Sequence, residues 1–324
     1  MAATTANKIA RYSTLWRIAP IGSMRRSLLP WSLLMCALLF ATCCDALSAP
    51  SAALTGWCQR LAPRLPGVSV ADCVASQLIS SGAASHHGFP ILTRQVQARA
   101  EQASSSPVRV LLLGGIHGDE LTASAIVFKW LQQLDTPLAK DFIWEVVPVL
   151  NPDGLLAARP SRVNGRGVDL NRNFPTPNWE LEARRYWVQT TASDPRRFPG
   201  TGPLSEPETR WLNREIARFK PNVIISVHAP FGVLDFDGPA PIPERFGRLQ
   251  FSRVGVYPGS LGNYGGKLNH IPVITIELPN SLKMPSDMDI ERIRLDMVNW
   301  IKLNIRQQTT SITAPFVDDV SMRE

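Results

Sequence analysis

Four short runs built almost entirely from Val, Ile and Leu recur along the sequence, separated by stretches of helix length. Strands with so few polar residues are typically buried on both faces, as in a parallel sheet covered by helices. The sequence therefore predicts an α/β fold with a largely parallel sheet. The predicted strands are residues 108–114 (VRVLLLG), 143–150 (IWEVVPVL), 222–227 (NVIISV) and 272–277 (PVITIE).

Two segments carry the clearest helical periodicity. Residues 205–219 place apolar side chains along one face, and Ser205 and Glu208 have the spacing of a capping box, which predicts a helix beginning at Ser205. Residues 287–305 repeat the pattern, and we expect a flexible tail over residues 306–324.

The first 48 residues have the features of an export signal. Met24, Arg25 and Arg26 precede the apolar stretch SLLPWSLLMCALLFA, and small residues follow in ALSAPSA. That stretch is shorter than the roughly 20 apolar residues of a membrane-spanning helix. We therefore expect cleavage near residue 48 and a periplasmic protein that does not stay on the membrane.

An MRR start is typical of signals, so Met24 is the expected initiator and residues 1–23 a start-site extension. Two alternatives remain open. The uncleaved segment could anchor the protein to the inner membrane, or Cys43 or Cys44 could carry a lipid, although the residues before them fit lipidation poorly.

Cysteine spacing suggests one disulfide. Cys36 lies in the signal segment together with Cys43 and Cys44, which leaves Cys58 and Cys73 in a lead-in over residues 49–87. An even pair in an exported protein is typical of a disulfide. The alternative is that both are ordinary small buried residues.

The positive charge does not indicate a nucleic-acid-binding protein. The formal net charge is +7, but residues 1–48 contribute +4 of it. No block of Lys and Arg interleaved with aromatic residues follows residue 50. We therefore expect no nucleic-acid partner.

Three of the four apolar runs end in a residue that can bind a metal or move a proton. His117 and Glu120 follow the first run, His228 follows the third, and Glu277 closes the fourth. Ligands of open α/β sheets bind outside the carboxyl ends of the strands. A catalytic zinc ion takes three His or carboxylate ligands and keeps one position open, so His117, Glu120 and His228 predict one zinc ion per chain.

Glycines explain how His117 and Glu120 could face the same point. Gly114, Gly115 and Gly118 permit a tight turn after the strand. Helix-like backbone from about Gly118 would place residues three apart on one side.

Glu277 is the candidate general base. A carboxylate at the end of a buried strand is costly unless it is paired or functional. Beside a zinc ion it could take a proton from water, which would hydrolyse an amide or an ester.

Five motifs occur in an order that resembles the zinc carboxypeptidase family, whose best-known member is carboxypeptidase A. They are HGDE, NPDG, GVDLNRNFP, SVHAP and ITIELP, and the resemblance spans about residues 88–305, the expected catalytic domain. It implies a three-layer αβα sandwich with a mixed, largely parallel central sheet. It also implies that His117, Glu120 and His228 are zinc ligands and that Glu277 is catalytic.

The resemblance assigns further roles to polar residues. Asn171 and Arg172 would bind the terminal carboxylate of a substrate, because a guanidinium meets a carboxylate with two parallel hydrogen bonds. Arg162 would polarise the scissile carbonyl, with Arg159 and Arg166 as competing candidates. The tyrosine that closes over the substrate would be Tyr257, although its spacing to the following glycine is short. Tyr264 could be plain packing, and we expect three histidines in loops to be solvated: His86, His87 and His270.

Within the family, TGPLSEPET, PGSLGNY and ITIELP resemble the murein peptide amidases, which implies cleavage of the γ-D-glutamyl to meso-diaminopimelate bond of peptidoglycan-derived peptides. Those enzymes are expected to act on recycled peptides in the cytoplasm, whereas this chain carries an export signal. Two alternatives are an N-acyl amino acid deacylase of the aspartoacylase or succinylglutamate desuccinylase type, and a zinc-holding binder of wall peptides without catalysis.

Overall fold

The computed structural model describes residues 52–98 and 107–311. The predicted signal segment, the start site and the final residues 312–324 lie outside this part of the chain. Within it, the expected lead-in and catalytic domain belong to one compact unit. No helix of this part is both long enough and apolar enough to cross a membrane.

Nine strands of the described residues form one mixed sheet, in the order β1-β2-β4-β3-β5-β9-β6-β8-β7. The four central strands, β4, β3, β5 and β9, are parallel, and β2 and β6 flank them in antiparallel pairing. The strands are β1 (Ile79–Ala84), β2 (Pro90–Val96), β3 (Val108–Leu113), β4 (Phe142–Val147), β5 (Val223–His228), β6 (Val233–Asp237), β7 (Arg245–Phe246), β8 (Leu249–Phe251) and β9 (Val273–Glu277).

The four predicted apolar runs are the four central parallel strands. β3, β4 and β5 are buried almost throughout, as expected for strands covered on both faces. Register places His228 of β5 beside Glu277 of β9. The carboxyl ends of β3, β5 and β9 therefore meet at one edge of the sheet.

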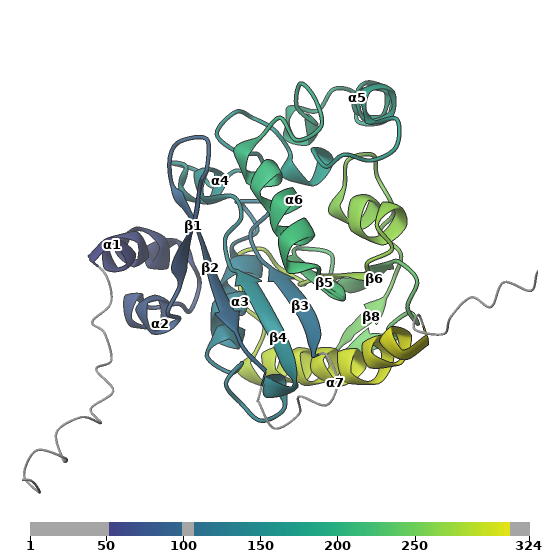
Figure 1. Cartoon of the computed structure of the whole chain (residues 1–324). Coiled ribbons are helices and arrows are strands. Elements are labelled where there is room, and N and C mark those ends of the chain that lie inside the picture. Colours follow the sequence, from purple (N-terminus) through teal and green to yellow (C-terminus); the bar gives the residue numbers. More distant parts are fainter. Residues whose placement is uncertain (1–51, 99–106, 312–324) are drawn as a thin grey trace, which may run out of the picture. The chain divides into compact units, whose positions relative to one another are not determined.

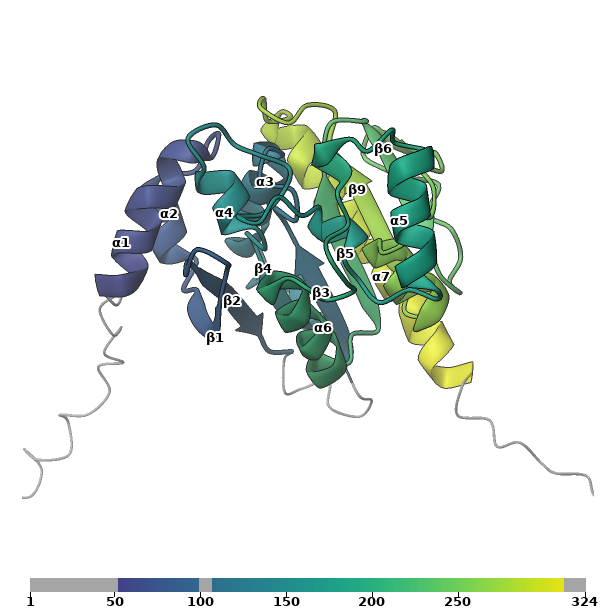
Figure 2. The ribbon, with the colours of Figure 1, turned by 90° about the horizontal axis from the view of Figure 1, so that it is seen from above.

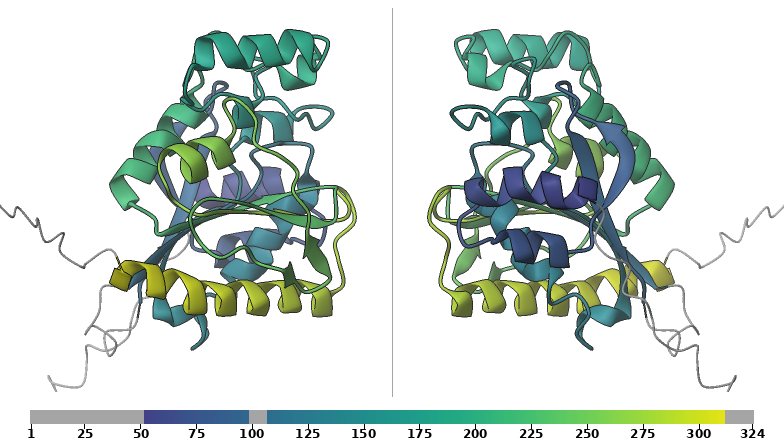
Figure 3. Two further views of the ribbon diagram at one scale, coloured as in Figure 1. Left: turned by 90° about the vertical axis from the view of Figure 1, so that its right-hand side faces the viewer. Right: turned by 90° about the vertical axis from the view of Figure 1, so that its left-hand side faces the viewer.

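Helices cover both faces of the sheet, which confirms the three-layer arrangement (Figures 1 and 3). α3 and α7 belong to one apolar core against the sheet, and α6 belongs to a second core on the opposite face. The helices are α1 (Ala52–Leu61), α2 (Val70–Ala75), α3 (Leu121–Leu131), α4 (Pro152–Leu156), α5 (Trp179–Gln189), α6 (Pro207–Phe219), α7 (Asp287–Ser311), the short 3₁₀ helix η5 (Leu170–Arg172) and the π-helix η7 (Gly262–Leu268).

The lead-in is a helical pair joined by a disulfide. Cys58 of α1 is bonded to Cys73 of α2, which confirms the expected pairing. Both helices lie beside the β1–β2 edge of the sheet (Figure 2). Because Cys58 and Cys73 are fully buried in the core, the pair extends the catalytic domain.

Two predicted helix boundaries are wrong. α6 begins at Pro207, and Glu206 precedes it without a side-chain cap. Ser205 accepts from Asn173, and Glu208 accepts from Asn164, so long-range hydrogen bonds replace the expected capping box. α7 continues to Ser311, beyond the predicted end at residue 305.

Candidate active site

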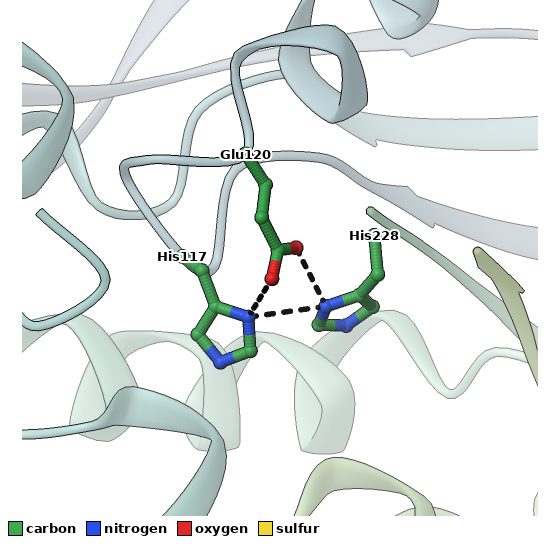
Figure 4. A group of neighbouring side chains, drawn as sticks. All are labelled: His117, Glu120 and His228. Carbon is green, nitrogen blue, oxygen red and sulfur yellow. Dashed lines mark hydrogen bonds and ion pairs between the residues drawn. The ribbon is translucent and has the colours of Figure 1, made fainter. Parts of the chain in front are cut away.

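Three side chains converge where β3 and β5 end. His117 Nδ1 lies 2.8 Å from Glu120 Oε1, and His228 Nδ1 lies 3.0 Å from Glu120 Oε2. The two Nδ1 atoms are 3.2 Å apart. Figure 4 shows both imidazoles and the carboxylate pointing to one centre, and these donors form a group that could hold a metal ion. The predicted ligand set is therefore assembled in space.

Each imidazole is held from outside the cluster by its other nitrogen. His117 Nε2 lies 3.1 Å from Asp169 Oδ1, and His228 Nε2 lies 3.0 Å from Ser226 Oγ. A ring nitrogen held in this way can donate its N–H outward, which leaves the Nδ1 lone pair facing the centre. Asp169 and Ser226 therefore fix the orientation that metal binding requires.

A glycine turn places His117 and Glu120 together. Gly115 has a φ of 62°, and a Cβ at Gly118 would lie 2.3 Å from the backbone of Gly154. Only glycine fits such a close approach without a shift of the backbone. The expected helix-like backbone from Gly118 is wrong, because α3 begins at Leu121 and Glu120 itself has a φ of −94° and a ψ of 65°. A turn, rather than a helical face, joins the two donors.

The chemistry of these donors fits zinc. Two imidazole nitrogens and one carboxylate oxygen, with the fourth position left to water, are typical of catalytic zinc sites. Burial opposes ionisation of Glu120, but His117 and His228 hold its pKa well below the usual value, so it stays an anionic ligand. A zinc ion held there would supply Lewis acidity, which lowers the pKa of water and polarises a carbonyl.

Glu277 lies next to this cluster with one oxygen free. Its Oε2 is buried and has no hydrogen-bond partner among the residues that the structure describes. Burial raises the pKa of Glu277, and the charge of Glu120 adds to that effect. A buried carboxylate with an unused oxygen and a raised pKa has the properties of a general base.

Arg162 is the arginine that reaches the cluster. Its Nε donates to Asp169 Oδ2 at 2.9 Å, and its Nη1 lies 3.6 Å from Glu120 Oε1. Arg159 is exposed, and Arg166 lies 3.9 Å from Glu206 instead. Of the three candidates named from the sequence, Arg162 is therefore the one that lies beside the predicted metal donors.

Arg172 is buried beside a cavity that also includes the metal donors. The cavity has a volume of about 580 Å³, and Asn171 and Arg172 both line it. Arg172 is 4% exposed, its Nε is unpartnered, and it forms no ion pair within the described part of the chain. Burial lowers its pKa, although Asp169 opposes this effect. An unpaired buried guanidinium can receive a carboxylate through two parallel hydrogen bonds.

Tyr257 lines the same cavity but is engaged elsewhere. Its ring packs under Arg172, with the guanidinium carbon 4.4 Å from the ring centre, and its hydroxyl donates to Val254 O at 2.7 Å. Tyr257 therefore packs against Arg172 in this structure. Closure of Tyr257 over a bound substrate stays a prediction. Tyr264 stacks on Phe174, as expected for packing.

Sequence reasoning missed residues that support the site. Asp169 lies two positions before Asn171 in the motif GVDLNRNFP, yet its contacts to His117 and Arg162 depend on the fold. Asp235 and Asp237 line the cavity from β6, a strand that was not predicted. The three loop histidines are exposed, as expected: His86, His87 and His270.

Comparisons with known proteins point to one enzyme family. The zinc carboxypeptidase family matches residues 75–234. Murein peptide amidase A of Escherichia coli K12 is 32% identical over 200 residues, which cover 59% of this chain and 78% of the relative. The chain belongs to the zinc carboxypeptidase family. A second similar relative is murein peptide amidase A of Vibrio campbellii, which is 31% identical over 213 residues, or 63% of this chain and 79% of the relative.

A solved carboxypeptidase structure supports the fold. Carboxypeptidase A from Helicoverpa armigera aligns with a TM-score of 0.51 at 18% identity, covering 74% of this chain and 69% of its own. As a zinc carboxypeptidase, the protein is a hydrolase that acts on peptide bonds. His117, Glu120 and His228 form a group that could hold its metal ion.

Proposed function

We propose that this zinc carboxypeptidase hydrolyses the γ-D-glutamyl to meso-diaminopimelate bond of murein-derived peptides. Two relatives named murein peptide amidase A support that substrate class. The observation that carries the proposal is Arg172, a buried cation without an ion-pair partner in the described residues, on the cavity that Glu277 also lines. This arrangement fits an amide bond next to a terminal carboxylate.

The chain's own residues supply a complete set of roles. Arg172 and Asn171 bind the terminal carboxylate and set the register of the substrate. Arg162 receives the negative charge that develops on the scissile carbonyl oxygen. Glu277 takes the proton from the attacking water and delivers it to the leaving nitrogen. Asp169 holds both His117 and Arg162, so one buried carboxylate aligns the metal site with the oxyanion site.

We further propose that the protein acts outside the inner membrane. The signal-like segment over residues 1–48 supports export, and peptidoglycan-derived peptides occur in the periplasm. Retention by an uncleaved segment remains the alternative. Comparing the mass of the protein from the periplasmic and membrane fractions distinguishes the two.

A side-by-side digest tests the substrate. The metal-loaded protein is given L-alanyl-γ-D-glutamyl-diaminopimelate, a series of peptides with ordinary C-terminal residues, and N-acyl amino acids. We expect release of free diaminopimelate from the tripeptide, at a higher kcat/KM than for the other two classes. Release of acyl groups alone would favour the deacylase, and binding of the tripeptide without turnover would favour the non-catalytic binder.

A further inference from the structure

Two consecutive arginines in the loop between α5 and α6 line the cavity. Arg196 and Arg197 end the short 3₁₀ helix η6 (Pro195–Arg197), and both belong to the same cavity wall as the metal donors and Arg172. Neither arginine takes part in the metal cluster or in the proposed binding of the terminal carboxylate. Charged side chains of the wall that have no such task are candidates for a further contact with the substrate.

η6 is fixed to the site and is not a free loop. The side chain of Asp194 accepts from the backbone N–H of Arg196 at 2.9 Å, and the carbonyl of Asp194 accepts from Trp187 Nε1 of α5 at 2.8 Å. Phe198, the next residue after η6, packs against Trp187, and its carbonyl accepts from the N–H of Asp169 at 2.8 Å. Asp169 also orients the metal site, so η6 is attached to the backbone of the catalytic groups. A side chain on such an element is well positioned for recognition.

Arg196 points to the loop that carries the metal donors. Its Nη2 donates to Asp119 Oδ2 at 2.8 Å, and its side chain makes no other hydrogen bond within the described residues. Asp119 lies between His117 and Glu120 in the sequence. A guanidinium carries five N–H groups, so most donors of Arg196 remain for another acceptor. Because its side chain is 58% exposed, a ligand in the cavity can reach it.

The contacts of Arg196 place it on the acyl side of the scissile bond. Arg172 would hold the carboxylate of the released residue, and Arg162 would hold the scissile carbonyl oxygen. Asp119 is close enough to Arg162 for their charges to interact, and Asp119 in turn holds Arg196. The path from Arg172 over Arg162 to Arg196 therefore runs from the released residue toward the acyl part of the substrate. Arg197 acts on Arg172, at the other end of this path.

We propose that Arg196 binds a carboxylate on the acyl side of the scissile bond, so that the preferred substrate carries one carboxylate on each side of that bond. The inference rests on the proposed function, which places the released residue on Arg172. In a γ-glutamyl amide the side-chain carboxyl forms the scissile bond and the α-carboxylate is free. A γ-linked glutamyl residue thus brings the second anion, which Arg196 receives through charge-assisted hydrogen bonds.

The charges of the cavity wall favour a substrate with two carboxylates. Among the described residues, four arginines line the cavity: Arg162, Arg172, Arg196 and Arg197. The charges of Arg162 and Arg197 both disfavour the ionised form of Arg172. A second carboxylate adds negative charge to a wall where like charges lie close together. Complementary charges of this kind contribute to specificity more than to overall affinity.

Matched substrates that differ in one carboxylate test the proposal. One pair is L-alanyl-γ-D-glutamyl-meso-diaminopimelate and the same peptide with the glutamyl α-carboxylate converted to its amide. A second pair does not depend on murein and consists of N-acetyl-glutamyl-leucine and N-acetyl-glutaminyl-leucine. We expect the wild-type protein to prefer the carboxylate about 10- to 100-fold in kcat/KM in each pair that it cleaves, and Arg196→Gln to remove most of this preference. The ratio within a pair cancels any general loss of activity.

Arg185→Gln is the control variant. Arg185 of α5 is also an exposed arginine bound to one carboxylate, Glu182 at 2.7 Å, but it lies outside the cavity. The variant has the same net charge as Arg196→Gln and should keep the wild-type preference. Isothermal titration calorimetry of the four peptides with Glu277→Gln adds a comparison of Kd values that needs no turnover and leaves Arg196 in place, and the carboxylate should again bind tighter.

The outcomes separate the two proposals. If neither tripeptide is cleaved but Arg196→Gln abolishes the preference for N-acetyl-glutamyl-leucine, the murein substrate is wrong and the anion site stands. If the tripeptide is cleaved and Arg196→Gln keeps the wild-type preference for the carboxylate, the anion site is wrong and the murein substrate stands. Absence of a preference for the carboxylate in both cleavage and calorimetry also overturns the site.

Discussion

Buried ionisable side chains gather at one end of this sheet and fall into two groups, those with charged or polar partners and those without an ion-pair partner. Glu120 is stabilised by His117 and His228, and Asp169 by Arg162 and His117, which hold both pKa values low against the effect of burial. Glu277, Arg172 and Asp237 lack an ion-pair partner among the described residues. Desolvated charges of the second kind destabilise a fold, so their presence in one cavity is best explained by a ligand that brings the missing partners.

Replacing Glu277 with Gln tests the proton transfer. Gln has the same shape but cannot accept a proton, so we expect kcat on the preferred substrate to fall by about 10²- to 10⁴-fold. Glu277 is not one of the three converging donors, so the metal content measured by atomic absorption should stay at one zinc per chain. A variant with near wild-type kcat would show that another group acts as the base.

Replacing Asp237 with Asn should stabilise the protein at neutral pH. The folded pKa of about 6 lies above the ordinary value of 3.8, so this group favours the folded state at low pH and loses that contribution as the pH rises through 6. The amide of the variant does not ionise, so the variant does not lose stability in this way as the pH rises. We expect its free energy of unfolding at pH 7.5 to exceed that of the wild type by about 1–3 kcal/mol.

Denaturant unfolding at several pH values measures this difference. The advantage of Asp237→Asn should narrow as the pH falls from 7.5 toward 4, because the wild-type carboxyl becomes neutral first in the folded state. Asp235, Arg253 and Lys267 act on the same group and are present in both proteins. A difference that does not change with pH would mean that Asp237 has an ordinary pKa.

The sequence predicted those site residues that can bind a metal or move a proton and that also stand at the end of an apolar run. His117, Glu120, His228 and Glu277 could be predicted because each follows or ends an apolar run, and parallel strands end at one edge. Asp237 could not, because what distinguishes it is the lack of an ion-pair partner among the described residues. A missing partner is a property of the folded surroundings and leaves no mark in local sequence.

At the scale of elements, burial decided which strands could be predicted. The central strands consist of apolar runs, whereas β6 reads VLDFD and places two aspartates among its five residues. Such a segment looks like a loop until its partner β9 is known. The same holds for α6, whose Ser205 and Glu208 have capping-box spacing but bond to residues from other parts of the chain.

The lead-in helices offer a prediction about stability alone. The Cys58–Cys73 bond closes a loop across a sequence separation of 15, for which chain entropy gives about 3 kcal/mol. Replacing both cysteines with Ala should lower the free energy of unfolding by about 2–4 kcal/mol, measured by denaturant unfolding. Because neither α1 nor α2 lines the cavity, kcat/KM of the folded variant should stay near the wild-type value. A large loss of activity at unchanged secondary structure would instead place the lead-in in the function.

Across the whole domain, the site depends on contacts between distant parts of the chain. His117 and His228 are separated by 111 positions, yet their Nδ1 atoms are 3.2 Å apart. The motifs revealed which residues take part, and the fold alone revealed how Asp169 links His117 to Arg162. The affinity for the metal should therefore depend on the packing of the entire sheet.

Removing the metal should lower both activity and thermal stability. A ligand that binds only the folded state at 100 times its Kd contributes about 2.7 kcal/mol, which corresponds to roughly 5–10 °C in Tm for a domain of this size. Treatment with 1,10-phenanthroline should abolish hydrolysis and lower Tm by that amount in differential scanning calorimetry, and added zinc should restore both. His228→Ala, which removes one of the three donors, should show a low Tm that the chelator does not change. Because Glu120 bonds to both imidazoles, the metal-free protein should still unfold in a single cooperative transition. A wild-type protein whose Tm and activity are unchanged by the chelator would rule out zinc at this cluster.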